Sequence, residues 1–519
     1  MIKGSSVGLR LQVVGLLIAL SACGGGGGGG GNTGPSTGNY VPGTFQPSST
    51  FAARCTAPRS GTNPATGQSY PDVAGTATDQ NNWLRSWTNE LYLWYREVPD
   101  LDPSQYATPA YFDLLKTSAL SGSGAAKDRF HFTYSTPQWL ALSQSGEEVG
   151  YGVQWALVST TPPRRAVIAY VEPNVPAATA NANLSRGVEI VTVDGFDLAT
   201  VNTSAGVDAL NAGMFPSTAG ESHTFVVREL NGSTRSVTLQ AAVITSTPVT
   251  SRVLSTPSGP VGYMLFNDHI GTAEAGLYNH IISLRNAGIT DLVLDIRYNG
   301  GGYLDIASEL AYMIAGTVPT AGRTFERLQF SDKHPVTNPV TGSSIQPTPF
   351  YTRTQGFSSG LPANTSLPTL NLPRVFVLTG SNTCSASESV INGLRGVDVQ
   401  VIQIGSTTCG KPYGFYPKDN CNTTYFSIQF RGVNAKNFGE YTDGFTPSPS
   451  PNAGALLPGC AVGDDFTQPL GDAAENRLQV ALAYRDTGQC IAAATTSSLA
   501  GIEAVVPKAI WKTSRILRE

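Results

Sequence analysis

The chain has 519 residues, enough to bury more than one hydrophobic core, so we expect two or three domains. Its formal net charge is −4 and only 13% of its residues are charged, which excludes a strongly basic nucleic-acid-binding protein and a chain with a long acidic tail. No Cys-x-x-Cys or Cys/His spacing is present, so no metal and no cofactor are expected.

A short apolar run near the start of the chain is typical of a signal peptide. Lys3 and Arg10 precede LQVVGLLIAL, which is too short to span a bilayer, and LSAC follows, ending at Cys23. This tetrapeptide resembles the bacterial lipoprotein signal, which implies that residues 1–22 are removed and that Cys23 carries lipid. Gly24 replaces the Asp that favours inner-membrane retention in such lipoproteins, so the resemblance implies an outer-membrane anchor facing the periplasm or the cell surface. A secreted protein with an incidental cysteine is the alternative.

Residues 23–50 are rich in Gly, Ser, Thr and Pro, which predicts a flexible tether. Residues 51–146 are predicted to form a small, mainly helical domain. Its first helix is expected to be capped by Thr78 or Asp79, and large side chains recur at every fourth position after the cap: Trp83, Trp87, Leu91 and Tyr95. We interpret this stripe as core and assign it no site.

Residues 147–245 read as short strands separated by turns. The strand-like segments are 151–158, 165–172, 187–195, 222–230 and 234–243, and a small-residue helix is predicted over 175–184. Their order resembles a PDZ domain, with the loop residues Gly150, Tyr151, Gly152 and Val153 placed where that family binds a terminal carboxylate. The resemblance implies that a bound chain end extends the sheet edge. An ordinary β-turn is the alternative for these four residues.

Residues 250–490 alternate strand and helix patterns, which predicts an α/β core with a parallel sheet. The predicted strands are 261–267, 291–297, 374–380 and 399–405, and the predicted helices are 272–288, 303–316, a helix after 385 and a closing helix within 471–490. A loop-rich insertion covers about 318–370. The tail, residues 491–519, ends in a basic amphipathic segment, and the sequence leaves open whether it packs on the body, touches lipid or is a tail on which the protein itself acts.

Three of these strands are followed by motifs of small or polar residues. YNGGG follows 291–297, SNTCSASE follows 374–380, and STTCGK follows 399–405. Because the carboxyl ends of parallel strands meet at one edge of a sheet, we expect the three motifs to lie together.

Together these motifs, and the PDZ-like segment before them, resemble the C-terminal processing peptidases, also called tail-specific proteases, over roughly residues 147–430. The resemblance implies crotonase-like βαβ units and an endopeptidase that cleaves exported polypeptides. It also implies that Ser385 is the nucleophile and Lys411 the general base, with Glu388 at the family's acidic position.

The chemistry supports these assignments. A serine hydroxyl needs a nearby base, and lysine serves as one only when its pKa is lowered by roughly two to three units. Ser385 begins a helix, so the N–H of Ala386 points outward, and the glycine turn at Gly301 and Gly302 offers a second donor. These groups are our candidates for an oxyanion hole.

Several alternatives remain open. Ser385-Ala-Ser-Glu388 also fits a capping box with no catalytic meaning. The family commonly has a Gln four residues after the lysine, where this chain has Phe415. The identity of the third catalytic residue therefore remains open. The second hypothesis is a catalytically inactive, peptide-binding lipoprotein. A His-based triad, an esterase and Cys384 as the nucleophile are less favoured; His269 is the one histidine placed near the site.

Six cysteines remain after Cys23, at positions 55, 384, 409, 421, 460 and 490. In an exported chain they permit three disulfides whose connectivity the sequence does not give. Proximity favours Cys409 with Cys421 and Cys460 with Cys490. The natural substrate and the oligomeric state are not predicted.

Overall fold

The computed structural model describes residues 40–63, 67–137, 139, 147–451, 454–492, 499–507 and 515–516. The predicted signal peptide, the lipidation residue Cys23 and most of the predicted tether lie outside these residues. Within the described part of the chain, every helix is too short or too polar to cross a bilayer.

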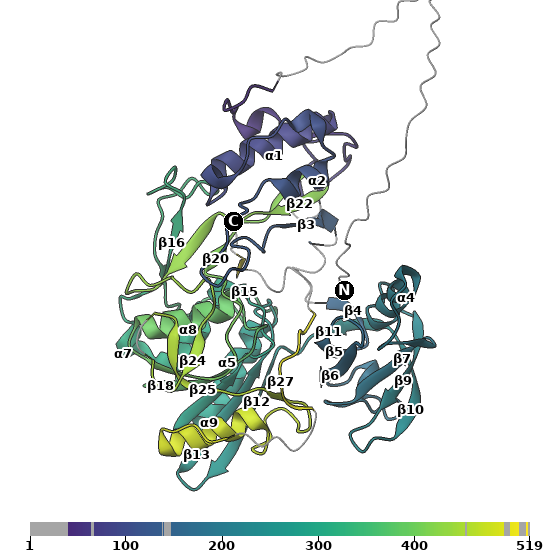
Figure 1. The fold of residues 1–519 in the computed structure, drawn as a ribbon. Helices are drawn as coiled ribbons and strands as arrows, with labels where there is room; N and C mark the ends of the chain where they lie inside the picture. The colour runs from purple at the N-terminus through teal and green to yellow at the C-terminus, as the bar shows by residue number, and fades with distance from the viewer. Residues whose placement is uncertain are drawn as a thin grey trace, which may run out of the picture.

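A seven-stranded sheet forms the centre of the molecule (Figure 1). Its strands, in spatial order, are β12 (Val249–Thr256), β13 (Gly259–Phe266), β14 (Asp291–Asp295), β18 (Arg374–Thr379), β19 (Gln400–Gly405), β25 (Leu456–Ala461) and β24 (Thr446–Ser448). All neighbours are parallel except β12 and β13, which are antiparallel. The four strands predicted from the sequence are therefore parallel neighbours.

Helices cover both faces of this sheet. The helices α5 (Ala273–Asn286), α6 (Leu304–Ala315) and α8 (Ala386–Gly396) pack on one face, and α9 (Asn476–Thr487) packs on the other. Because β14 and β18 are buried on both faces, they are continuous apolar runs rather than alternating ones, which is why the sequence identified them.

A second sheet forms a separate β domain, which lies beside the core in Figure 1. Its strand order is β10 (Thr234–Gln240), β9 (Ser222–Arg228), β7 (Glu189–Val193), β6 (Arg165–Val171) and β5 (Val153–Ser159), with β8 (Phe196–Asp197) paired to β7. The strands β4 (Glu147–Gly150) and β11 (Ala242–Thr245) pair with each other. Within this sheet β5 has only one neighbouring strand.

The helix predicted over 175–184 is wrong. Only a short 3-10 turn, η4 (Pro176–Ala178), forms there, and Asn183 adopts a positive φ of 41° that a helix does not allow. The helix of the β domain is instead α4 (Ser204–Met214), which begins after the capping residue Thr203. Its two internal glycines weaken the helical signal, so the sequence did not reveal it.

The N-terminal part contains α1 (Ala77–Leu91) and α2 (Thr108–Leu114). The cap of α1 is Thr76 rather than the expected Thr78 or Asp79, because Thr76 and Asp79 form a reciprocal capping box. Trp83 and Trp87 are buried and stacked at 5.2 Å, as the predicted core stripe requires. The helix ends at Leu91, so Tyr95 lies beyond it in a 3-10 turn.

Residues 40–50, expected to belong to the tether, lie against α1. The guanidinium of Arg85 stacks on the rings of Tyr40 and Phe45, at 4.9 and 4.2 Å from their centroids. The Ser48 N–H donates to the carboxylate of Glu90 at 2.7 Å. The ordered part of the chain thus begins before residue 50.

Shorter elements complete the structure and join the N-terminal part to the core. A β3 strand (Phe132–Ser135) pairs with β22 (Thr423–Phe426), and β22 pairs with β21 (Lys418–Asn420). The remaining elements are η1 (Ser48–Thr50), β1 (Arg54–Cys55), β2 (Val73–Ala74), η2 (Tyr95–Glu97), η3 (Pro103–Gln105), β15 (Gly302–Tyr303), α7 (Thr317–Thr320), β16 (Thr324–Phe330), β17 (Thr348–Pro349), β20 (Tyr413–Gly414), β23 (Phe430–Val433), β26 (Asp464–Asp465), β27 (Ala500–Ile502) and β28 (Arg515–Ile516).

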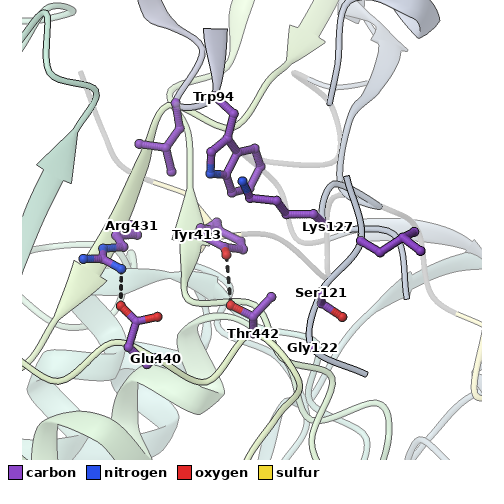
Figure 2. Close-up of a pocket in the computed structure, with 10 residues that line it drawn as sticks. Trp94, Ser121, Gly122, Lys127, Tyr413, Arg431, Glu440 and Thr442 are labelled. Carbon is purple, nitrogen blue, oxygen red and sulfur yellow. Dashed lines mark hydrogen bonds and ion pairs between the residues drawn. The ribbon is translucent and has the colours of Figure 1, made fainter. Parts of the chain in front are cut away.

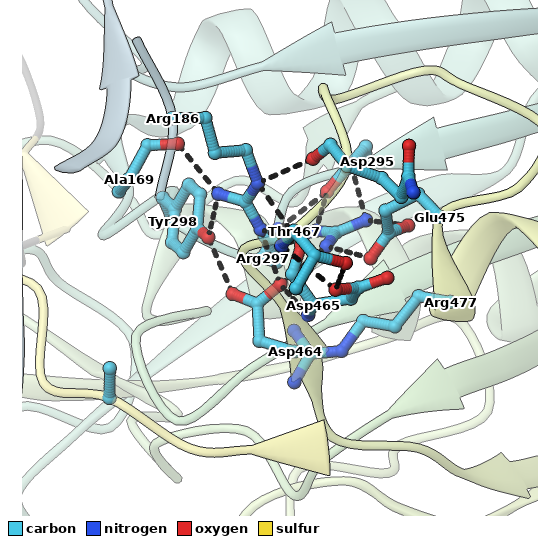
Figure 3. Close-up of polar contacts among 12 residues, drawn as sticks. Ala169, Arg186, Asp295, Arg297, Tyr298, Asp464, Asp465, Thr467, Glu475 and Arg477 are labelled. Carbon is cyan, nitrogen blue, oxygen red and sulfur yellow. Dashed lines mark hydrogen bonds and ion pairs between the residues drawn. The ribbon is translucent and has the colours of Figure 1, made fainter. Parts of the chain in front are cut away.

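A buried ionic network joins the β domain to the core (Figure 3). Arg186 of the β domain donates to Asp464 at 2.7 Å and to the Tyr298 hydroxyl at 2.7 Å, and Arg297 donates to Asp464 and Glu475 at 2.7 Å each. Burial alone would raise the pKa of Asp464, but the charges of Arg186 and Arg297 hold it well below its usual value. The network therefore fixes the β domain against the residues that follow β14.

Three disulfides are formed. Cys460 pairs with Cys490, as the sequence favoured. The pairing of Cys409 with Cys421 is wrong, because Cys409 pairs with Cys384 and Cys421 pairs with the distant Cys55. Proximity along the chain failed because these partners come from loops that only the folded sheet brings together.

Candidate active site

The three motifs that follow β14, β18 and β19 are held together by hydrogen bonds. The Thr383 hydroxyl donates to the Ile296 carbonyl at 2.9 Å, which links the second motif to the end of the first strand. The Cys384 N–H donates to the Asn299 carbonyl at 3.1 Å, and the Cys409 N–H donates to the Thr383 carbonyl at 2.9 Å. The motifs therefore meet at one edge of the parallel sheet, as predicted.

Ser385 occupies a strained position at the start of α8. Its φ of 60° and ψ of −114° lie in a region that residues with a side chain rarely adopt, so the surrounding contacts hold it there. Its side chain is fully buried, and its Oγ makes no hydrogen bond to any residue that the structure describes. The Glu388 carboxylate accepts the Ser385 N–H at 2.9 Å, as a capping box requires, so the motif starts the helix and also leaves the Oγ without a described partner.

Glu388 connects the nucleophile candidate to the Gly-Lys turn. One carboxylate oxygen accepts the backbone N–H groups of Ser385 and Lys411, at 2.9 and 2.8 Å. The other accepts the Thr408 hydroxyl at 2.5 Å and the Gly410 N–H at 2.8 Å. Burial raises the pKa of Glu388 and outweighs these hydrogen bonds, which lower it. The carboxylate thus positions the backbone of Lys411.

Lys411 is buried, and its side chain lies between two aromatic rings. Its Nζ is 4.7 Å from the centroid of the Phe130 ring and 5.0 Å from that of Phe415. Phe415, which stands where the family commonly has Gln, is fully buried and packs edge-on against Phe426 at 5.3 Å. Two aromatic rings, those of Phe130 and Phe415, therefore lie near the Lys411 amine.

The glycine turn lies directly against Ser385. A Cβ added to Gly301 would come within 2.8 Å of the Ser385 Cβ and 2.9 Å of the Ala386 nitrogen, so only glycine fits there. The Gly301 N–H donates to the Asn299 side chain at 2.9 Å and is not available to a substrate. Among the three predicted oxyanion donors, Ala386 and Gly302 remain the candidates.

The Cys384–Cys409 disulfide lies within the site. It joins the residue before Ser385 to a residue two positions before Lys411. The side chains of three residues that can bind a metal lie together here, Cys384, Glu388 and Cys409, but the two sulfurs are bonded to each other and offer no thiolate. The same bond makes Cys384 unsuitable as a nucleophile.

No histidine ring is described in a hydrogen bond with Ser385. The ring hydrogen bonds described for His131, His223, His269, His280 and His334 go to other residues, and none goes to Ser385 Oγ. His269 lies beside the glycine turn, as expected, where its Nδ1 is 3.0 Å from the Asn299 side-chain oxygen. Its position is that of a residue supporting the turn.

The predicted carboxylate-binding loop lies directly before β5. Gly152 has a φ of +74°, and a Cβ there would lie 2.4 Å from Val175, so the turn requires glycine. Tyr151 is buried, and its hydroxyl donates to the Gly213 carbonyl at 2.9 Å. The Tyr151 side chain is therefore part of the domain core rather than of a binding surface.

The N-terminal part contributes side chains that the sequence did not assign to the site. Phe130 contacts Lys411, and Arg129 donates to the Cys409 carbonyl. Nearby, a cavity of about 430 Å³ opens between the N-terminal part and β20, with Trp94 facing Tyr413 and Lys127 beside Trp94 (Figure 2). No motif marks these residues, because their place in the site depends on how the N-terminal part packs.

Comparison with one solved structure shows a similar fold. A protein of Bacteroides fragilis NCTC 9343, named "Putative S41 protease", has a TM-score of 0.56 at 22% identity, over 81% of this chain and 98% of that one. A photosystem II D1 C-terminal processing protease has a TM-score of 0.42 at 18% identity, over 72% and 92% of the two chains. No curated protein matches the chain significantly.

Family models match two segments. Residues 79–134 match the peptidase S41 N-terminal domain, which includes Phe130. Residues 260–416 match peptidase family S41, which includes both Ser385 and Lys411. These matches confirm the peptidase resemblance that the three motifs indicated: the chain contains peptidase S41 domains over these two segments and is a serine peptidase.

Proposed function

We propose that this peptidase hydrolyses polypeptides with a Ser385–Lys411 dyad. The observation that carries the proposal is the strained, buried Ser385 whose hydroxyl has no described hydrogen bond, held by Glu388 next to the backbone of Lys411. Strain of this kind costs about 1–3 kcal/mol and persists where the surroundings over-determine it, as catalytic sites do.

In the mechanism, Lys411 in its neutral form takes the proton of Ser385 Oγ as that oxygen attacks the scissile carbonyl carbon. The tetrahedral oxyanion accepts hydrogen bonds from the N–H groups of Ala386 and Gly302, and the positive end of α8 stabilises it further. Lys411 then donates the proton to the departing amine. Water, activated by the same amine, hydrolyses the acyl-enzyme.

The hydroxyl does not hydrogen-bond to Lys411 in this structure, so the dyad forms as substrate enters. Catalytic hydrogen bonds often tighten only in the substrate complex. The low-polarity surroundings of Phe130 and Phe415 favour a neutral amine by excluding water, whereas their ring faces favour the charged form. The mechanism requires the exclusion of water, which favours the neutral amine, to outweigh the attraction of the ring faces for the charged amine.

We further propose that the β domain is PDZ-like and binds substrate chain ends. Gly150 to Val153 form the turn before the edge strand β5, so a peptide added to β5 would direct its carboxylate toward backbone N–H groups of that turn. We also propose that Cys23 carries a lipid anchor that holds the protein at a membrane. The Cys23→Ser variant should therefore appear in the soluble fraction.

The test of the dyad is cleavage of an unfolded protein by Ser385→Ala and Lys411→Met variants. Both variants should fold, with unchanged circular dichroism, and both should lose activity by at least about 100-fold. Full activity in either variant would exclude the dyad. A folded wild type that binds chain ends but cleaves nothing would favour the second candidate function, a peptide-binding protein. The specific observation behind that candidate is Phe415, which stands where the family commonly has Gln.

A further inference from the structure

The segment after α9 returns to the body of the protein between the core and the β domain. The β27 strand pairs antiparallel with β26, and the Phe466 N–H donates to the Leu499 carbonyl at 3.0 Å. In Figure 1 this chain runs between the two sheets. The residues that follow, 503–507, therefore reach the β domain from the core side.

Val505, in the middle of residues 503–507, forms a β-bridge with the outer edge of β5. The Leu157 N–H donates to the Val505 carbonyl at 2.7 Å, and the Val505 N–H donates to the Leu157 carbonyl at 2.9 Å, in an antiparallel bridge. The Gln154 side chain donates to the Pro507 carbonyl at 2.8 Å. This direction leads the segment along β5 toward Gly150 to Val153, as a peptide that adds to a PDZ-type edge would run.

The opposite edge of the same segment is held by Asn382, which lies three residues before Ser385. The Asn382 amide nitrogen donates to the Ala504 carbonyl at 3.2 Å, and its oxygen accepts the Val506 N–H at 3.1 Å. Ala504 and Val506 are 8% and 4% exposed, whereas Val505 is 53% exposed. Residues 503–507 thus lie between the β domain and the loop that precedes Ser385, and their hydrogen bonds to Leu157 and Asn382 are made through their backbone.

The next described residues of the chain, β28, pair in parallel with β15, that is, with Gly302 and Tyr303. His269 already occupies one edge of this turn, because its N–H donates to the Gly301 carbonyl and its carbonyl accepts the Tyr303 N–H. Successive backbone groups of a strand point to opposite sides, so the N–H of Gly302 faces β28. That N–H is one of the two candidate oxyanion donors.

We propose that residues 503–507, together with 515–516, are an intramolecular competitor of the substrate, which must displace them from the β5 edge and from Gly302. The proposal rests on the proposed function, because it takes the β5 edge as the docking site of chain ends. Backbone pairing fits any extended peptide, so a substrate of different sequence can make the same bonds. A tethered segment competes at an effective concentration that reaches about the millimolar range.

The test compares Val505→Pro with Val505→Ala in the full chain carrying Ser385→Ala. Proline removes the N–H that bonds to Leu157, whereas alanine keeps it and loses only an exposed side chain. The probe is a fluorescent peptide, LAGIEAVVP, which copies residues 499–507. Val505→Pro should bind it about tenfold more tightly than Val505→Ala, and a chain ending at Ala492, which keeps the Cys460–Cys490 disulfide, should bind at least as tightly.

Equal dissociation constants in the proline, alanine and shortened chains would overturn the proposal. With Ser385 restored, the proline variant should also show a lower KM than the alanine variant. Tighter binding by the proline variant, combined with no cleavage by the chains in which Ser385 is restored, would refute the dyad and keep the competitor. Cleavage with the same KM in both Val505 variants would keep the dyad and refute the competitor.

Discussion

Removing the Cys384–Cys409 disulfide should damage catalysis far more than its effect on stability explains. The bond closes a loop with a sequence separation of 25, so the loss of loop-closure entropy predicts a decrease of about 3.5 kcal/mol in the free energy of unfolding for Cys384→Ala/Cys409→Ala. It also frees the residues beside Ser385 and Lys411. Because a misplacement of about 1 Å costs about 100-fold in rate, we expect kcat to fall by that factor.

The Cys460–Cys490 disulfide provides a matched control. It has a sequence separation of 30, for which the same relation gives about 3.7 kcal/mol, and it ties β25 to the segment after α9 rather than to the site. Cys460→Ala/Cys490→Ala should therefore lose similar stability in urea unfolding and keep its kcat at temperatures where it is folded. Equal loss of kcat in the two double variants, or no loss in either, would refute the reasoning.

Three further predictions follow from single contacts. Gly301→Ala should abolish peptide hydrolysis, since its Cβ would lie 2.8 Å from that of Ser385, whereas Gly288→Ala, with no atom within 4 Å of the new Cβ, should keep it; equal activities would contradict the packing. Glu388→Gln should lower kcat with little change in KM, because the new NH2 group would face two of the four groups that now donate hydrogen bonds to the carboxylate. An unchanged kcat would mean that Glu388 acts only as a helix cap. Burial beside Glu274 raises the pKa of Glu309 to about 9, so the folded state retains a proton that the unfolded state loses. The free energy of unfolding should therefore fall between about pH 4.5 and 9, by up to about 1.4 kcal/mol per pH unit. Glu309→Gln should remove that slope in urea unfolding measured across this range.

The sequence revealed the strands and turns that surround the site because their signals are local. The runs 291–297, 374–380 and 399–405 are mainly apolar, and each is followed by a motif of small or polar residues, in which Gly301 is fixed by its close approach to Ser385. These features identified Ser385 and Lys411 as candidates before the fold was known.

The parts that the sequence did not reveal depend on contacts between distant segments. Arg186 and Phe130 sit in no motif, and Asn382, although it lies within SNTCSASE, has no role that the motif predicts. Each acquires its contacts only when the β domain, the N-terminal part or the C-terminal segment packs on the core. The pairing of Cys384 with Cys409 likewise follows from the meeting of two loops. Sequence distance carried no information about it.

The most direct test of the central claim is the rate at which a fluorophosphonate probe modifies Ser385. The probe reports the nucleophile activated by its base and needs no natural substrate. We predict labelling of Ser385 in the wild type, none in Ser385→Ala, and a rate at least about 100-fold lower in Lys411→Met. Labelling of Lys411→Met at the wild-type rate would contradict the role of Lys411 as the general base.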